Sequence, residues 1–577
     1  MSSLPRAPGF VELFTPKFVT VLKEGYGPAA LRADAVAGLT VAIVALPLSM
    51  AIAIASGVTP DRGLYTAIVG GFLISLLGGS RFQIGGPAGA FIVLVAGTVA
   101  VHGVEGLVIA TLLSGLVLVA AGFLRLGTYI KYIPYPVTVG FTAGIASIIF
   151  ASQLKDLLGL TLAGPEPSAF LPKLEALGLA LPTASVPAVG IAALAIGLIV
   201  VVRHYRPQWP NLLIAVTAAS LAAVLLHLPV ETIGTRFGGI PRGLPVPHLP
   251  ALSPARVLSL LPIALSFALL GSIESLLSAV VADSMSGRRH RSNCELVAQG
   301  IANVAAALFG GFCVTGTIAR TATNVRAGAH GPVAGMLHAL FLLLFMLLAA
   351  PLAAYIPLAA LAGLLVTVAW NMAEKHAFAT LLRASRGDAV VLLATFGLTL
   401  LRDLTEGIVV GFALAALLFV HRMSQTIDVQ GGLPASLDDE ADGARDRGHG
   451  GYPGGPMDRD IAVHRISGAF FFGAAATVGA ALDRIAAHPK AHVIDFSAVP
   501  IIDSTAAITI EGFVRRARKH HAAVYVSGAS VAVRRELLTH GLREPLVRYR
   551  EDVDSAVDEA RRERAAGGPQ PAGHGDR

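Results

Sequence analysis

Two charged residues stand inside long apolar stretches of the sequence. Glu274 lies within ALLGSIESLLSAVVAD, and Arg320 follows the glycine-rich run LFGGFCVTGT. A charge at the centre of a membrane-spanning helix costs about 2.5 to 3.5 kcal/mol unless it is paired or faces a cavity. We therefore expect both residues to lie on a transport path through a membrane.

Two glycine-rich runs precede predicted helix starts and supply the chemistry for an anion. The first turn of a helix leaves N–H groups unpaired and carries about half a positive charge. Two such ends facing each other predict an anion site, to which Arg320 adds a full charge. The alternative is that the glycines only allow close helix packing and that Arg320 extends to the cytoplasmic surface. The residues of the two starts are Pro87, Ala88, Gly89, Ala90, Thr315, Gly316 and Thr317.

Glu274 has several interpretations that the sequence leaves open. It could carry a coupling proton, belong to an ion site or balance the charge of Arg320. A structural ion pair or hydrogen bond between two helices explains it equally well. Ser278 lies one turn later and shares its helix face, so both residues are coupling candidates.

Other polar and breaking residues surround these candidates. Glu295, Gln299 and Asn303 recur every four residues, which places them on one helix face and favours interhelical hydrogen bonds. Asn324, one turn beyond Arg320, is expected to orient it. Pro47 interrupts an apolar segment, so 47–52 forms either a third wall of the site or an ordinary kink.

The composition indicates which elements must position these residues. With 54% hydrophobic and 14% charged residues and a mean hydropathy of +0.68, the chain is too apolar for a soluble protein. Cys294 and Cys313 both lie in the apolar part, which excludes a disulfide framework. We expect no cleaved signal peptide. The net charge of +7 falls mostly in short loops, so we assign it to membrane orientation and expect no nucleic-acid partner.

Apolar segments fill the chain up to about residue 422 and predict a polytopic α-helical membrane protein. Several are shorter than the ~20 residues that span a bilayer. Basic residues favour the even-numbered connections, which predicts cytoplasmic N- and C-termini. The two sets of seven resemble halves of an internal inverted repeat, each with a short third segment after a glycine-rich kink, the pattern of a transporter site. The segments are 35–56, 64–79, 87–101, 105–122, 136–151, 187–203, 211–228, 256–283, 294–309, 315–328, 332–350, 356–371, 388–401 and 405–422.

The C-terminal part has a different pattern. We predict a cytoplasmic lead-in at 1–34, a transporter domain at 35–423, a disordered linker at 424–459, a small α/β domain at 460–564 and a disordered tail at 565–577. Strands are predicted at 461–466, 468–472, 491–496 and 523–528, and helices near 475–487, 504–519, 531–541 and 551–564. Asp503 or Ser504 is expected to cap a helix. A regulatory alternative is phosphorylation of Ser504 or Thr505.

Taken together, these motifs resemble the SulP (sulfate permease, solute carrier family 26) anion transporters with a C-terminal STAS domain. The resemblance rests on ALPLSMAIAIASGVTP with GLY at 63–65, GGPAGAF, GSIESLLSAVVADSMSG, ELVAQGIAN, TGTIARTATNVRAGA and VIDFSAVPIIDSTA. It implies a fold of seven plus seven inverted-repeat segments divided into core and gate domains, an elevator-like motion and homodimers. Cys313 departs from the proline that the family commonly has before the tenth helix.

The family resemblance also implies a site between the third and tenth segments. It extends the candidate residues to Gly86 through Phe91 and Thr315 through Arg320, including Ile318 and Ala319, with Leu48 and Ile52 as walls. The implied substrates are sulfate, bicarbonate, halides, oxalate and C4-dicarboxylates. Sodium-using relatives carry Asp in place of Glu274, so proton coupling or exchange is preferred.

The leading prediction is a secondary active transporter of small anions in a bacterial inner membrane. Its expected partners are the anion, a proton, membrane lipid, a second copy of the chain, and a regulatory protein or nucleotide at the STAS domain. No metal-ligand spacing, nucleotide loop or catalytic triad appears, so we predict no enzyme, metal or cofactor. The alternatives are a membrane-anchored anion sensor that signals through the STAS domain, and an anion channel.

Overall fold

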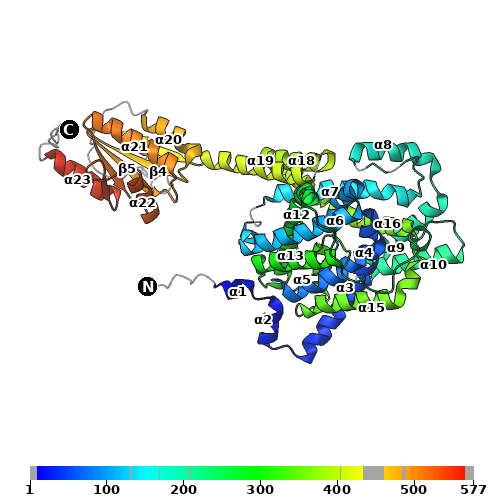
Figure 1. The fold of residues 1–577 in the computed structure, drawn as a ribbon. Helices are drawn as coiled ribbons and strands as arrows, with labels where there is room; N and C mark the ends of the chain where they lie inside the picture. Colours follow the sequence, from blue (N-terminus) through cyan, green and yellow to red (C-terminus); the bar gives the residue numbers. More distant parts are fainter. Residues whose placement is uncertain are drawn as a thin grey trace. The chain divides into compact units, whose positions relative to one another are not determined.

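The computed structural model describes residues 9–129, 133–164, 166–167, 169–206, 209–402, 404–432, 460–483 and 489–565. The chain divides into two compact units, Met1–Ala415 and Ala416–Arg577, and each is described by itself (Figure 1). Most of the predicted linker, 433–459, and most of the predicted tail, 566–577, lie outside the described residues, as do residues 1–8 of the lead-in.

The first unit is helical, as the sequence predicted. Among the described residues of the chain, eight helical spans are long and apolar enough to cross a membrane, and the last of them, Leu404–Ser424, continues past Ala415. Each of the fourteen predicted segments overlaps a helix or consecutive helices, whereas helices in the connections, such as α8 and α17, were not predicted. The helices are α1 (Phe10–Phe14), α2 (Lys17–Glu24), α3 (Pro28–Ala55), α4 (Pro60–Tyr65), α5 (Gly71–Leu77), α6 (Ile92–Phe123), α7 (Tyr135–Leu158), α8 (Phe170–Ala180), α9 (Val186–Tyr205), α10 (Asn211–Leu225), α11 (Ile233–Phe237), α12 (Pro254–Ser286), α13 (Ser292–Leu308), α14 (Ile318–Arg326), α15 (Val333–Ala353), α16 (Leu358–Met372), α17 (Lys375–Ala384), α18 (Arg386–Leu401) and α19 (Leu404–Ser424).

Helix α6 contains two of the predicted segments. At Gly103 the backbone leaves helical geometry, with φ 67° and ψ −178°, between the segments predicted at 87–101 and 105–122. A positive φ is readily adopted only by glycine, so this residue permits the break. The second predicted segment is likewise composite, because α4 continues through a π-helical turn, Thr66–Gly70, into α5.

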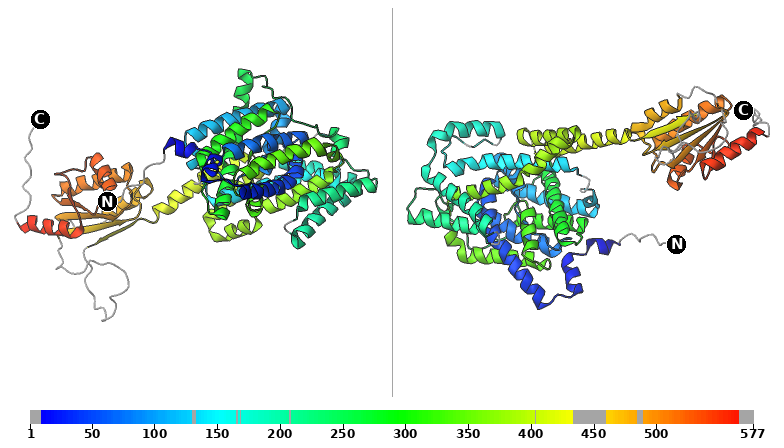
Figure 2. Two further views of the ribbon diagram at one scale, coloured as in Figure 1. Left: turned by 90° about the horizontal axis from the view of Figure 1, so that it is seen from below. Right: turned by 180° about the vertical axis from the view of Figure 1, so that it is seen from behind.

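The helices form two bundles that mix the halves of the sequence. In a first bundle α13 and α12 pack along α6, and α15 packs along α3; in a second, α16 and α18 pack on α7, and α9 packs on α10 and α16 (Figure 2). At Gly115 and Gly300 the backbones of α6 and α13 approach so closely that a Cβ on either residue would lie 2.6 or 2.5 Å from the other's carbonyl oxygen. The bundles meet chiefly where α3 passes α10 and α16.

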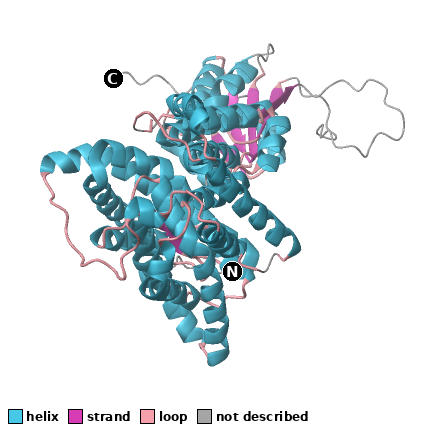
Figure 3. Ribbon diagram, turned by 90° about the vertical axis from the view of Figure 1, so that its right-hand side faces the viewer, coloured by secondary structure: helices cyan, strands magenta, loops and turns pink. Residues whose placement is uncertain are grey.

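A two-residue ladder joins the repeat halves inside the first bundle. Strands β1 (Gly85–Gly86) and β2 (Thr315–Gly316) pair antiparallel, with Gly85 opposite Gly316 and Gly86 opposite Thr315. Figure 3 shows the ladder as a short magenta segment among the helices. Thr315 and Gly316, predicted as part of a helix start, are therefore strand residues.

The second unit is an α/β domain around one five-stranded sheet. The strand order is β3 (Asp428–Gly432), β4 (Ile461–Ser467), β5 (Ala491–Ala498), β6 (Ala523–Ser527) and β7 (Arg548–Arg550), with β3 antiparallel and the others parallel. The helices are α20 (Phe472–Asp483), α21 (Ser504–Lys519), α22 (Val531–Thr539) and α23 (Val553–Ala565).

Three details of this unit differ from the sequence predictions. The stretch predicted as a linker from residue 424 contains strand β3, which pairs with β4. The strand predicted at 468–472 is wrong, because only Phe470 forms an isolated bridge, to Ile502, and α20 begins at Phe472. Strand β7 was not predicted, since its three residues carry no apolar alternation.

Candidate functional site

The ladder brings the two predicted helix starts together. Thr317 donates its backbone N–H to the carbonyl of Ile84 at 3.0 Å, and the N–H of Ile84 donates to Thr321 Oγ1 at 3.1 Å. Directly beyond the crossing, one chain enters a 3₁₀ turn, Gly89–Phe91, that leads into α6, and the other enters α14. Neither helix start has a side-chain cap, so first-turn N–H groups are available to a ligand.

Arg320 lies at this crossing and is the most informative residue of the site. Its side chain is only 1% exposed, and Nη2 donates to Ser49 Oγ at 3.1 Å and to the carbonyl of Pro87 at 3.4 Å. Among the described residues, Nε and Nη1 have no hydrogen-bond partner. Buried donors without partners are costly in a folded protein, and an anion would satisfy them.

Gly86 provides the space that this guanidinium group occupies. A Cβ at Gly86 would overlap Nη1 of Arg320, so no larger residue fits while the arginine keeps this position. The glycine at this position therefore allows the guanidinium group of Arg320 to approach the backbone closely. Gly89, in the same run, faces the second bundle, where an added Cβ would lie 3.4 Å from Ile149 Cδ1 and 3.5 Å from Met372 Sδ.

The predicted residues come from three segments that meet at the crossing: α3, the chain from β1 into α6, and the chain from β2 into α14. Leu48 and Ile52 of α3 are buried beside Ser49. Phe91 packs edge-on against Phe267 at a ring distance of 5.9 Å. Two predicted residues of the α14 start, Ile318 and Ala319, are exposed, whereas the following residues are buried: Gly86, Pro87, Ala88, Ala90, Thr315, Gly316 and Thr317.

Amide side chains on the polar face of α13 bind the segment that leads into β2, and Gln299 also forms the predicted interhelical bond, to α12. Asn303 Nδ2 donates to the carbonyl of Val314 at 2.8 Å, and its Oδ1 accepts the N–H of Val314 at 3.0 Å. Gln299 Nε2 donates to the carbonyl of Gly271 at 2.9 Å, which also accepts Thr315 Oγ1 at 3.0 Å. These bonds fix the segment that contains Cys313.

Two polar residues of the site region form bonds that were not predicted, although Ser49 lies within the wall predicted at 47–52. Ser49 binds Arg320 directly, and Gln83 Nε2 donates to Ser275 Oγ at 2.6 Å and to Glu295 Oε1 at 2.8 Å. Gln83 is a polar residue in otherwise apolar surroundings, which is the signal that would have identified it.

Glu274 and Asn324 do not bind Arg320. Glu274 is half-buried in α12 and, within the described residues, forms no hydrogen bond or ion pair, so the charge-balancing interpretation finds no support. Ser278, one turn away, donates to Thr321 Oγ1 at 3.0 Å and so contacts α14. The orienting role expected of Asn324 is wrong, because its Nδ2 donates to the carbonyl of Phe82 at 2.9 Å and links α14 to the segment before β1.

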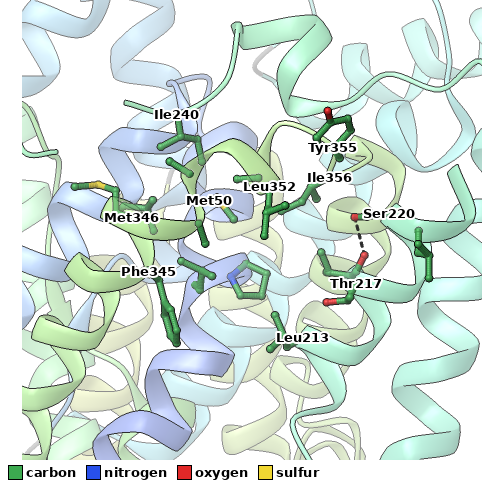
Figure 4. A pocket seen from close by; sticks show the side chains of 18 of the residues that line it. Met50, Leu213, Thr217, Ser220, Ile240, Phe345, Met346, Leu352, Tyr355 and Ile356 are labelled. Carbon is green, nitrogen blue, oxygen red and sulfur yellow. Dashed lines mark hydrogen bonds between the residues drawn. The ribbon is translucent and has the colours of Figure 1, made fainter. Parts of the chain in front are cut away.

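A large apolar cavity lies on the other face of α3. Its volume is about 460 Å³, and Figure 4 shows Met50, Leu213, Phe345 and Met346 among the side chains around it. It separates α3 and α15 from α10, and no charged residue lines it. An anion would lose its hydration there without compensation, so the candidate anion site is the Arg320 crossing instead.

In the second unit, Asp503 caps α21 as predicted. Its Oδ1 accepts the N–H of Ala506 at 2.9 Å, and its Oδ2 accepts the N–H of Phe472 at 2.8 Å. Ser504 and Thr505 are exposed, and Ser504 Oγ donates to Glu536 Oε1 at 2.9 Å.

Known proteins with similar sequences are anion transporters. The chain is 39% identical over 509 residues to the putative sulfate transporter YvdB of Bacillus subtilis, covering 88% of this chain and 93% of that protein. It is 32% identical over 521 residues to the bicarbonate transporter BicA of Synechocystis sp., covering 88% and 90%.

Solved structures show the same fold. The transmembrane domain of a cyanobacterial bicarbonate transporter BicA aligns with a TM-score of 0.61 at 32% identity, covering 66% of this chain and 98% of that one. The murine solute carrier 26 family member A9 aligns with a TM-score of 0.80 at 17% identity over 97% of this chain and 96% of that one, which shows the shared fold alone.

Matches to two families cover both units. Residues 31–395 match the sulfate permease family, and residues 456–560 match the STAS domain. The first match spans more than half of the chain and includes both halves of the Arg320 crossing. The protein therefore belongs to the sulfate permease (SulP, solute carrier 26) family and carries a C-terminal STAS domain.

Proposed function

We propose that this protein is a secondary active transporter of small inorganic or organic anions, and that it holds the anion between Arg320 and the helix starts at Gly89 and Ile318. The observation that carries the proposal is the buried guanidinium group with Nε and Nη1 unpartnered among the described residues. A positive helix end contributes at most about 2 kcal/mol for an anion in partly buried geometry, so the full charge of the guanidinium group attracts the anion more strongly than either helix end does.

The transport step is proposed as an elevator-like movement of the first bundle against the second. Every proposed binding group belongs to the first bundle: Ser49 to α3, the crossing residues to β1 and β2, and Arg320 to α14, which packs on α12 and α3. The opposing wall near Gly89 is formed by Ile149 and Met372, which are apolar. An apolar wall offers the anion no competing polar partner, so the anion would travel with the first bundle.

Sulfate, bicarbonate and C4-dicarboxylates are the proposed substrate class. The relatives YvdB and BicA are named for sulfate and bicarbonate, and N–H groups with one arginine accept any of these oxyanions. Glu274 and Ser278 are proposed to couple transport to a proton, since Glu274 lies half-buried in α12 without an ion pair among the described residues.

The proposed setting is a bacterial inner membrane with both termini in the cytoplasm, where the protein forms a homodimer. The bacterial relatives and the basic residues of the even-numbered connections support this setting. The STAS domain is proposed to bind a regulatory protein or a nucleotide, with Ser504 and Thr505 as exposed phosphorylation sites.

Uptake by proteoliposomes tests the transport function. Labelled sulfate, bicarbonate and a C4-dicarboxylate are offered to the reconstituted full chain, with and without sodium and with and without a pH gradient. The proposal predicts saturable uptake of at least one anion, driven by the pH gradient or by counter-anion and unaffected by sodium. Flux that rises linearly with concentration would identify a channel. No flux of any of the three anions, from protein that binds one of them, would favour the sensor.

A further inference from the structure

A groove on the surface of the second bundle combines an apolar cavity with a cationic mouth. It lies between α9 and α16 near the C-terminal ends of both helices, and its volume is about 250 Å³. The lining residues are Ile196, Ile199, Val200, Arg203, Val366, Thr367, Trp370 and Asn371.

The inner part of the groove is aliphatic and opens outward. Ile196, Ile199, Val200 and Val366 supply branched apolar side chains, and Val200 is 57% exposed. In a membrane-spanning unit such an outward-facing surface meets lipid acyl chains. Trp370 is 62% exposed at the mouth, the position that tryptophan favours at a membrane–water interface.

Two cations converge on adjacent residues of α16 at this mouth. Arg203 Nη1 donates to Asn371 Oδ1 at 3.0 Å. Lys375 Nζ donates to the carbonyl of Trp370 at 2.8 Å and lies 3.6 Å from the centroid of its ring. Within the described residues neither cation has an ion-pair partner, so both keep donors for an external anion.

The surroundings of the mouth are also cationic on balance. Arg206 lies three residues after Arg203 and is exposed, whereas Glu374 next to Lys375 is the nearest acid along the chain. Cations at the ends of α9 and α16 also complement the helix dipoles, but the dipoles do not require an apolar cavity beneath the charges. A membrane-orientation signal does not require a cavity either.

We propose that this groove binds one anionic phospholipid, with an acyl chain in the cavity and the phosphate between Arg203 and Lys375. The apolar lining selects an amphiphile over a free oxyanion, and the paired cations select an anionic headgroup over a neutral one. The site is separate from the Arg320 crossing, because no residue lining the groove belongs to the crossing.

The sequence provides a reporter for this site. It contains two tryptophans, and Trp370 lines the groove while Trp209 does not. In the full-length variant Trp209→Phe, fluorescence therefore reports on the groove. The protein is reconstituted into vesicles of neutral, unbrominated phosphatidylcholine. Increasing amounts of a lipid brominated on one acyl chain, either phosphatidylglycerol or phosphatidylcholine, are included, since bromine quenches a tryptophan that it contacts.

Brominated phosphatidylglycerol is expected to quench Trp370 at lower mole fraction than brominated phosphatidylcholine. A basic residue near an anionic lipid changes occupancy about fivefold. Arg203→Gln and Lys375→Gln should each weaken the preference by about that factor. Arg383→Gln, which removes the same charge from exposed α17 outside the groove, should leave the preference unchanged.

Several results would overturn the proposal. Equal quenching by the two lipids would show an acyl crevice without headgroup selectivity. A preference for phosphatidylglycerol that survives in the double variant Arg203→Gln/Lys375→Gln would place the headgroup elsewhere. If Arg383→Gln weakened the preference as much as the groove variants do, the preference would reflect general surface charge. Inorganic phosphate that abolishes the lipid preference at matched ionic strength would identify the mouth as a soluble-anion site.

Discussion

At the scale of single residues, the site depends on the space left for one guanidinium group. Arg320 has Nη2 bound to Ser49 and Pro87, and Nη1 lies where a side chain at residue 86 would begin. The charge and the glycine-rich run were visible in the sequence. Their contact was not, because 234 positions separate residues 86 and 320 and the β1–β2 register alone brings them together.

The change Gly86→Ala should lower anion affinity at least about fivefold, because overpacking of a filled site costs about 1–3 kcal/mol and here would displace the guanidinium group. Concentration-dependent uptake in proteoliposomes measures the effect. Gly97→Ala is the matched control, since no atom lies within 4 Å of its added Cβ. Equal affinities for the two variants would argue against the assigned position of Arg320.

Replacing Glu274 with Gln separates coupling from architecture. The carboxyl group forms no ion pair among the described residues, so the variant should fold with unchanged thermal stability. We expect uptake driven by a pH gradient to disappear while anion exchange continues, because an amide cannot carry the proton. A large loss of stability, with coupling intact in the remaining folded protein, would instead assign Glu274 a structural role.

At the scale of elements, local signals predicted the helices but not every pairing between distant segments. The polar face of α13 was recognised from its four-residue period, and Gln299 makes the interhelical bond that this period indicated, to Gly271 of α12, whereas Asn303 binds Val314 in the segment before β2. Strand β3 escaped prediction because its glycine-containing sequence acquires strand structure only by pairing with β4. Asn324 was misassigned because its partner, the carbonyl of Phe82, lies on a distant segment.

Asn303→Asp tests how much the side chain of Asn303 on α13 stabilises the segment before β2. An aspartate keeps the acceptor for the Val314 N–H but loses the 2.8 Å donor to the Val314 carbonyl, which is left with only the longer bond from Gln299 Nε2 at 3.4 Å. The expected loss is about 1–3 kcal/mol of stability. It is measured as a lower thermal midpoint of the purified protein, together with weaker protection of that midpoint by the transported anion. An unchanged midpoint would show that the amide does not support the segment.

In the STAS sheet, β4 and β5 share a buried histidine pair. His464 Nε2 and His492 Nδ1 lie 2.9 Å apart beside Phe513. Burial, together with the neighbouring His492, lowers the pKa of His464 to about 3, and burial lowers the pKa of His492 to about 4. Both rings are therefore neutral in the folded domain at neutral pH.

This pair predicts an acid-sensitive STAS domain. Histidines in the unfolded chain titrate at about pH 6.5. Below that pH the unfolded state binds more protons than the folded state, so the free energy of unfolding decreases as the pH is lowered. Hydrogen exchange of the full chain, corrected for intrinsic rates, should show that protection of β4 and β5 is full above about pH 6.5 and declines toward pH 4. His492→Phe should flatten that decline. An identical decline in this variant would assign the acid sensitivity to other groups.

At the scale of the whole molecule, the chain joins a membrane unit of two bundles to a separate STAS unit. Composition predicted the membrane class, and the paired broken segments predicted where the repeat halves converge. How the helices sort into two bundles was not readable from composition or period, because it depends on contacts such as Gly115 against Gly300 across the two halves.

The central claim is that Arg320 provides the charge for the transported anion. Saturable uptake of the identified anion is compared for Arg320→Ala and for Arg326→Ala, which removes an exposed arginine from the same helix. Both variants are first shown to be folded by size-exclusion profile. The account predicts that Arg320→Ala abolishes saturable uptake and that Arg326→Ala retains it. Saturable uptake by the folded Arg320→Ala variant at the wild-type rate would contradict the account.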